Sequence, residues 1–207
     1  MADDLYTLKS FLKLKSIQEY LQDNDLESVY LLWRRQGGSN QLLTTFFLQN
    51  DINPLEYMSY IVDGMFKGIA FINSIDLSDT QIEQIDSLAF EDCLMLKDIN
   101  LGNVKYIGIG AFSGCSSLYN ITFPPSVDSI DEEAFSYSGL ISIHIPNTVK
   151  RIGLKAFSHN KELIKVTTDH TKEEFIKVCC GDDVLKHTFG NCTWLHKIIC
   201  SDGELEV

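Results

Sequence analysis

The sequence predicts an α/β fold in which a repetitive solenoid of about five or six coils follows a small α-helical N-terminal domain. Three observations predict it. An Ala-Phe pair recurs with fixed neighbours, an Ile-x-Ile alternation follows each pair, and residues 1–62 show helical spacing without the repeat. We place the two domains at residues 1–62 and 63–207. Hydrophobic residues make up 44% of the 207 residues, which is enough apolar surface for a packed core.

The repeat is clearest when the chain is aligned on its Ala-Phe pairs. Phe90 is followed by Phe112, Phe135 and Phe157, at steps of 22, 23 and 22 residues. In each unit a Leu-x-x-Ile-x-Ile stretch predicts a short strand with two inward residues. The Ala-Phe-x-x-Cys stretch has the spacing of one helical turn, so we expect a helical turn there. One coil cannot bury its own apolar face, and the stacked coils therefore predict a solenoid.

Weaker copies at Met65-Phe66 and Thr188-Phe189 extend the array in both directions. From Ile107 to Val127 the chain reads I-G-I-G-A-F-S-G-C-S-S-L-Y-N-I-T-F-P-P-S-V. This segment resembles the BspA-like leucine-rich repeats almost position for position, and the resemblance covers about residues 63–203. It implies a right-handed leucine-rich-repeat solenoid. Many members of that family are bacterial or protist surface proteins, and some are carried by phages and mobile elements.

Residues 1–62 predict three or four short helices. Asp25 is placed to cap a helix over Leu26–Arg35, which Gly37-Gly38 would end, and Ser39 or Asn40 is placed to cap the next one. We expect these helices to cover the open end of the solenoid or to dock another protein. A helix-turn-helix DNA reader is not expected, because the segment has five basic residues against eight acidic ones.

The charge of the chain excludes some partners. There are 17 Lys and Arg residues against 29 Asp and Glu residues, a formal net charge of -12. Direct binding to nucleic acid or to an anionic membrane needs clustered basic residues, so we expect neither. From Asp76 to Asp98 the chain has seven acidic residues and one Lys. That stretch is either a solvated face or an acidic surface that meets a basic partner.

The sequence also bears on location. No window approaches the roughly 18 apolar residues of a membrane-spanning helix. The start, Met-Ala-Asp-Asp-Leu-Tyr, lacks the basic and apolar regions of a signal peptide. We therefore expect a soluble cytoplasmic protein whose thiols are free.

The six cysteines present a choice between packing and metal binding. Cys93, Cys115 and Cys192 occupy one repeat position, which Ser138 and Asn160 fill elsewhere, and this predicts a buried column of small side chains. A zinc site would have to draw on Cys179, Cys180, His187, Cys192, His196 and Cys200. Their spacing matches no standard zinc signature, so we expect no metal.

Catalysis finds little support in the sequence. A Gly-x-Ser-x-Gly elbow, a phosphate-binding Gly-Lys-Ser/Thr loop and a His-Glu-x-x-His motif are all missing. The acidic run Asp131-Glu132-Glu133 precedes Ala134-Phe135, where we expect carboxylates to favour the start of a helical turn. We predict a protein without enzymatic activity and without a cofactor.

The remaining candidate site is the outward face of the predicted strands. Regular repetition should place its residues in parallel columns on an extended surface suited to binding a macromolecule. Ile141 and Ile164 lie near this surface and could add apolar contacts. The candidate partner-binding residues are Lys97, Asp98, Asn100, Tyr119, Asn120, Thr122, Ser142, His144, Lys165 and Thr167.

Three functions are compatible with such a face. The first is a non-catalytic protein-protein interaction module that binds its partner through the sheet. The second is an intracellular acidic inhibitor, of phage or mobile-element origin, that blocks a basic nucleic-acid-binding enzyme. The third is a surface adhesion module. The sequence does not name the partner.

Overall fold

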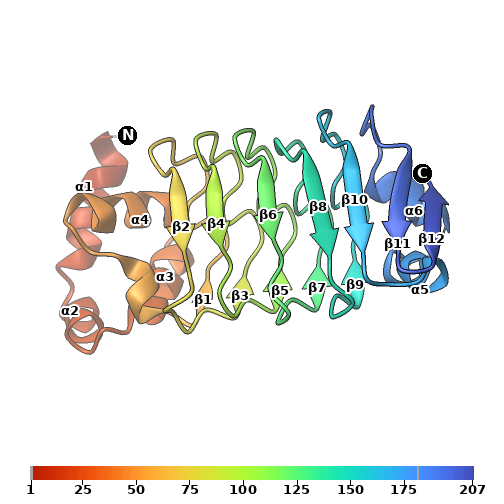
Figure 1. Ribbon diagram of the computed structural model, residues 1–207. Coiled ribbons are helices and arrows are strands. Elements are labelled where there is room, and N and C mark those ends of the chain that lie inside the picture. The colour runs from red at the N-terminus through yellow and green to blue at the C-terminus, as the bar shows by residue number, and fades with distance from the viewer. Residues whose placement is uncertain (1, 181) are drawn as a thin grey trace.

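The computed structural model describes residues 2–180 and 182–207 and shows an elongated stack of coils with helices at its N-terminal end (Figure 1). Among these residues no helix has both the length and the hydrophobicity to span a bilayer. The helices are α1 (Ala2–Leu12), α2 (Lys15–Gln22), α3 (Leu26–Arg35), α4 (Asn40–Gln49), the 3-10 helix η1 (Pro54–Tyr57), α5 (Lys172–Val178) and α6 (Asp182–Thr188).

Each coil contributes a strand to the front face, and each coil except the last also contributes a short strand to a back sheet. The back sheet has the order β1 (Tyr60–Ile61), β3 (Gln84–Ile85), β5 (Tyr106–Ile107), β7 (Ser129–Ile130) and β9 (Arg151–Ile152). The front strands are β2 (Ser74–Asp76), β4 (Asp98–Asn100), β6 (Asn120–Thr122), β8 (Ser142–Ile145), β10 (Lys165–Thr168), β11 (Lys197–Cys200) and β12 (Gly203–Glu206). They form a two-stranded sheet of β2 and β4 beside a five-stranded sheet in the order β6, β8, β10, β11 and β12, and we refer to both together as the front sheet. The paired strands are parallel, except that β12 pairs antiparallel with β11 and closes the stack. The predicted solenoid is therefore confirmed, with about five turns.

The centre of the solenoid is a column of phenylalanine rings, one from each coil. Neighbouring rings have centroids 4.9–5.5 Å apart and planes within 8° of parallel. Because the repeat brings the same side chain to the same place in every coil, each ring packs on the one before it. The stacked residues are Phe66, Phe90, Phe112, Phe135, Phe157 and Phe189. We number the coils one to six by these residues.

The Ala-Phe stretch is not a helical turn, and that prediction is wrong. In the first five coils the residues two before and two after the phenylalanine have positive φ, which interrupts a right-handed helix. In the fourth coil these residues are Glu133 at φ 55° and Tyr137 at φ 56°, on either side of Phe135. The backbone therefore zigzags through two tight turns.

This zigzag joins the coils by a third ladder of backbone hydrogen bonds. The N–H groups of Leu88, Phe90 and Asp92 donate to carbonyls of the third coil at 2.7–2.8 Å. The carbonyl of Ala89 in turn accepts from the N–H of Phe66 in the first coil, at 2.7 Å. Each N–H in the ladder points to the following coil and each carbonyl to the preceding one. The turns hence bind the coils together much as the two sheets do.

The acidic run before Phe135 also differs from the prediction. It does not begin a helical turn, since Glu133 has positive φ. The carboxylate of Asp131, only 8% exposed, accepts hydrogen bonds from Tyr106 Oη and Arg151 Nη2, both at 2.8 Å. Asp131 thus links β5 to β9 across the back sheet.

The predicted column of small side chains is present. Its members also donate hydrogen bonds to buried backbone carbonyls, which the sequence did not reveal. Cys93, Cys115 and Cys192 donate from Sγ to the carbonyl of the preceding coil's phenylalanine at 3.0–3.2 Å. Ser138 Oγ and Asn160 Nδ2 make the same bond in their coils, at 2.9 and 2.8 Å. The slot therefore selects hydrogen-bond donors, because each buried carbonyl needs a partner. Burial raises the pKa of the Cys93 thiol to about 12, which keeps it a donor.

The N-terminal helices lie at the first coil of the solenoid (Figure 1). Asp25 caps α3, with its carboxylate accepting from the N–H of Ser28 at 3.0 Å. Ser39 stands at the N-cap position of α4, but its side chain makes no capping hydrogen bond. Asn40 Nδ2 donates to the carbonyl of Asp63 at 2.7 Å, where the solenoid turns begin. The helical core continues into the solenoid core. The back sheet starts with β1, just before the expected boundary at residue 62.

Candidate functional site

The front sheet arranges the predicted binding residues in two parallel columns. Asn120, Ser142 and Lys165 pair across β6, β8 and β10, and Thr122, His144 and Thr167 form the second column. Asp98 and Asn100 occupy the two outward positions of β4, and Lys97 and Tyr119 directly precede β4 and β6. All ten side chains are exposed except those of Ser142 and Thr167, which are partly buried. The geometry brings the predicted residues together, while their role in binding remains a prediction.

Side-chain hydrogen bonds fix part of this face. His144 Nδ1 lies 2.9 Å from Thr167 Oγ1, and His144 Nε2 lies 3.2 Å from Asp169 Oδ2. Ser142 Oγ donates to Asn120 Oδ1 at a longer 3.5 Å. The imidazole is thus held from both sides on an exposed surface. A side chain already held in place loses less conformational entropy when a partner binds.

A hydroxyl, an imidazole and a carboxylate in a row also occur in hydrolases, but this row lacks their other features. The His144 and Asp169 side chains are each more than half exposed, on a flat sheet. A hydrolase needs a pocket that excludes water and donors placed for a developing oxyanion. The row is better explained as a rigid polar contact surface.

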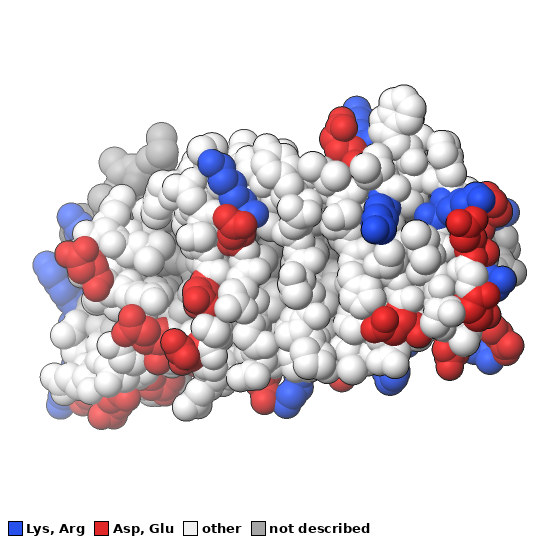
Figure 2. Space-filling view, in the orientation of Figure 1, with Lys and Arg blue, Asp and Glu red and all other residues white. Residues whose placement is uncertain are grey.

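Charge is distributed unevenly over the front face. Figure 2 shows the middle of this face, over β6 and β8, without Lys, Arg, Asp or Glu, whereas charged side chains gather toward both ends. At the C-terminal end Lys197 Nζ pairs with Glu204 at 2.6 Å and with Glu206 at 3.6 Å. The middle of the sheet is therefore polar but uncharged, which is typical of the centre of a protein interface.

Sequence reasoning missed two groups on this face. Asp169 follows the end of β10, outside the repeated strand pattern, and only the folded turn brings it to His144. Ser74 and Asp76 extend the two columns onto β2, where they pair with Asp98 and Asn100. The weak first repeat could have revealed this strand if Ile75 had been aligned with Ile99.

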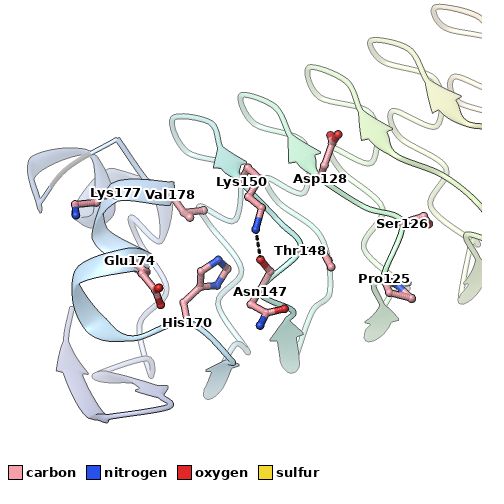
Figure 3. Close-up of a pocket in the computed structure, with 10 residues that line it drawn as sticks. All are labelled: Pro125, Ser126, Asp128, Asn147, Thr148, Lys150, His170, Glu174, Lys177 and Val178. Carbon is pink, nitrogen blue, oxygen red and sulfur yellow. Dashed lines mark hydrogen bonds between the residues drawn. The ribbon is translucent and has the colours of Figure 1, made fainter.

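A groove of about 580 Å³ lies beside the C-terminal helix α5. Figure 3 shows His170 projecting toward Lys150 and Asn147 on the facing turn, while Lys177 points away. Several polar groups here already serve the fold, whereas the buried Thr148 Oγ1 makes no hydrogen bond. Lys150 Nζ donates to the Asn147 carbonyl at 2.6 Å, and Glu174 closes a capping box with Thr171 at the start of α5. The groove lacks a free acid-base pair among its lining residues and gives no support for catalysis.

His170 makes the attachment of α5 sensitive to pH. Its side chain is 4% exposed, with Nδ1 2.9 Å from Thr168 Oγ1 and Nε2 3.0 Å from the carbonyl of Val149. Burial lowers the pKa of His170 against the opposing effects of that carbonyl and of Glu174. The folded pKa is below the unfolded value of about 6.5, so stability is complete above that pH and falls as the solution becomes more acidic.

We expect the melting temperature of the wild type to fall between about pH 7 and pH 5 by more than that of His170→Gln, since the unfolded chain takes up a proton at His170 in this window more readily than the folded chain does. Differential scanning calorimetry across this range measures it. The exposed His144→Gln variant is the matched control and should follow the wild type. Parallel curves for the wild type and His170→Gln would contradict this role for His170.

The C-terminal cysteines and histidines do not converge. Cys192 bonds to the Phe157 carbonyl, and burial raises the pKa of the Cys179 thiol to about 12. Cys180 is exposed and all six thiols are free. Within residues 2–180 and 182–207, no group of three or more His, Cys, Asp or Glu residues is arranged to hold a metal ion.

Comparison with known proteins decides the family. A sequence profile of the BspA type leucine rich repeat region matches residues 43–164 in six copies, more than half of the chain. The chain belongs to the BspA-type leucine-rich repeat family. The BspA-type match ends earlier than the resemblance over about residues 63–203, because α5 and α6 interrupt the period between Phe157 and Phe189. It also starts earlier, within α4.

Two solved structures share the fold. A leucine-rich repeat protein from Bacteroides ovatus ATCC 8483 is 28% identical, with a TM-score of 0.56 over 69% of this chain and 35% of that one. The pneumococcal vaccine antigen PcpA is 19% identical, with a TM-score of 0.52 over 70% of this chain and 33% of that one. This chain therefore spans about a third of the length of either structure. No curated protein matches it. BspA-type repeats and their structural neighbours are generally non-catalytic interaction or surface modules.

Proposed function

We propose that the chain is a non-catalytic protein-binding module whose partner contacts the middle of the front sheet. The observation that carries the proposal is the pair of columns across the front strands, uncharged over β6 and β8, with His144 held between Thr167 and Asp169. An uncharged, pre-ordered centre favours association, because a partner need not strip water from fixed charges. Charged residues at both ends would form the rim.

The test compares three immobilised proteins in a lysate of the native host. These are the wild type, the double variant Thr122→Arg/His144→Ala, and the control Gln84→Arg, which places the same charge on an exposed position of the back sheet. We expect the wild type and Gln84→Arg to retain the same protein. The double variant should retain at least about tenfold less of it, since it removes one contact and adds a desolvated charge. Equal retention by all three would contradict binding through the front sheet.

A second candidate function is that of an acidic inhibitor of a basic nucleic-acid-binding enzyme, which would act in the cytoplasm. Acidic side chains line a groove of about 650 Å³ between the helical domain and the first coils, and this favours the idea. They are Asp25, Glu27, Glu56, Asp76 and Asp79.

Salt dependence separates the two proposals. Capture of a basic enzyme that weakens steeply with salt and is lost in Asp76→Asn/Asp79→Asn would support the inhibitor. Capture that resists salt and depends on Thr122 and His144 would support the front sheet.

A further inference from the structure

A line of exposed apolar side chains follows one edge of the solenoid, distinct from the polar columns of the front sheet. Each lies within two positions of the buried Leu or Ile that precedes a front strand, in the upper loops of Figure 1. All six coils contribute, with exposed fractions between 39% and 61%. We call this surface the apolar rim, and its members are Phe71, Leu94, Met95, Tyr119, Ile141, Ile164 and Trp194.

In the middle of the apolar rim the backbone joins three members directly. The N–H of Ile141 donates to the carbonyl of Tyr119, and the N–H of Ile164 to the carbonyl of Ile141, both at 3.0 Å. The Tyr119 ring also leans over the next coil, where a Cβ on Gly139 would lie 3.2 Å from Tyr119 Cδ1. Gly139 therefore leaves room for the ring and, more critically, for the Ser116 carbonyl oxygen, which would lie 2.3 Å from that Cβ. Together the seven side chains expose several hundred square ångströms of largely apolar surface, at the upper end of what a monomer ordinarily leaves in water.

We propose that the apolar rim pairs with the apolar rim of a second copy of this chain in an antiparallel two-fold dimer. Two copies share one repeat spacing, about 4.8 Å between neighbouring strands, so their side chains stay in step along the whole rim. With the axis between the third and fourth coils, Tyr119 faces Ile141 of the other copy and Met95 faces Ile164. The surface available approaches the roughly 800 Å² per partner of a stable interface.

The pairing covers Tyr119 but leaves open the two columns of the front sheet, including Thr122 and His144, and it does not depend on the function proposed above. Its salt dependence is distinctive. Each copy carries a formal charge of -12, which opposes association at low ionic strength. Added salt screens that repulsion without weakening apolar contacts. The affinity of the dimer should therefore rise from low to physiological salt. The affinity of an acidic inhibitor for a basic enzyme should instead fall over the same range.

The test is sedimentation equilibrium on the purified chain and its variants. We expect the wild type to approach twice its 23.4 kDa mass with rising concentration. Ile164→Glu and Met95→Lys should each weaken the dimer by about 100-fold, since each buries an unpaired charge. Combined in one chain, Met95→Lys/Ile164→Glu should restore it, because the axis places the two opposite charges against each other twice. Ile109→Glu alters a side chain exposed to 45% away from the rim and should remain dimeric.

Circular dichroism confirms that each variant is folded before its mass is measured. A wild type that stays monomeric at about 100 μM overturns the proposal, since interfaces of this size bind in the micromolar range or tighter. A dimer that is unchanged by Ile164→Glu also overturns it. If both single variants dissociate and the double variant does not recover, the antiparallel pairing is wrong.

Discussion

Replacing Phe112 by alanine is expected to lower the free energy of unfolding by about 3–5 kcal/mol. The ring is fully buried and stacks between Phe90 and Phe135, with centroids 5.0 and 5.1 Å away. The substitution leaves a cavity that the neighbouring coils cannot fill, because their backbones are fixed by the two sheets and the ladder of turns. Urea denaturation followed by circular dichroism measures the loss.

The same substitution should also change how the chain unfolds. Each coil contacts only its neighbours, so weakening the third coil separates the array into two parts that unfold less cooperatively. We expect a lower m-value as well as a lower midpoint. Ile199→Ala is the control, since that side chain is 45% exposed on the front face and should cost less than about 1 kcal/mol. A Phe112→Ala protein as stable as Ile199→Ala would contradict the role given to the ring column.

Replacing Asn160 by alanine is expected to cost about 2–4 kcal/mol, because it leaves several buried polar groups without partners. Asn160 Nδ2 donates to the carbonyls of Phe135 and Phe157, each at 2.8 Å, and Oδ1 accepts from the N–H of Leu140 at 3.3 Å. The side chain is fully buried, so water cannot replace these bonds. Thermal and urea unfolding give the measured cost.

Neighbouring coils supply graded controls for this slot. Ser138→Ala removes a single bond, to the Phe112 carbonyl, and should cost less than Asn160→Ala. Cys115→Ser keeps a donor to the Phe90 carbonyl and should be close to neutral, whereas Cys115→Ala should not. If all four substitutions cost the same, the slot would be selecting for size alone.

Much of the fold was readable from the sequence because the repeat multiplies a weak signal. A single alternating stretch such as Ile143-His-Ile145 is compatible with many structures, but four such stretches in register favour stacked parallel strands. Asp25 was recognisable as a cap because its chemistry is local, and the carboxylate needs only a free N–H one turn ahead. The columns of the front sheet followed directly, since register fixes which side chains share a face.

The turns could not be read in the same way. A Phe and a Cys three residues apart fit either a helical turn or a zigzag that contains left-handed residues. In the fourth coil Glu133 and Tyr137 take that conformation against their own preference, held by bonds to the neighbouring coils. A hint was present in the third coil, where Gly110 and Gly114 occupy the same two positions with φ of 59° and 75°.

The candidate site was likewise predictable from the sequence only in part. His144 was placed on the surface from its position in the repeat, but its contact with Asp169 depends on how the chain leaves β10, which no periodicity specifies. Part of the apolar rim could be recognised from the sequence, since Tyr119, Ile141 and Ile164 share a repeat position. Phe71 and Trp194 come from the irregular first and last coils, where the alignment was weakest.

The ladder of turns gives the solenoid an electrical polarity along its axis. Its peptide dipoles all point the same way, with carbonyls toward the helical domain and N–H groups toward the C-terminus, opposite to the order in an α-helix. The end toward the helical domain therefore needs hydrogen-bond donors for its carbonyls, and the C-terminal end needs acceptors for its N–H groups. Asn40 supplies an N–H donor to the Asp63 carbonyl at one end, and the Leu185 carbonyl of α6 accepts from the N–H of Phe189 at the other. Further coils could be inserted between these caps, but the caps could not be exchanged.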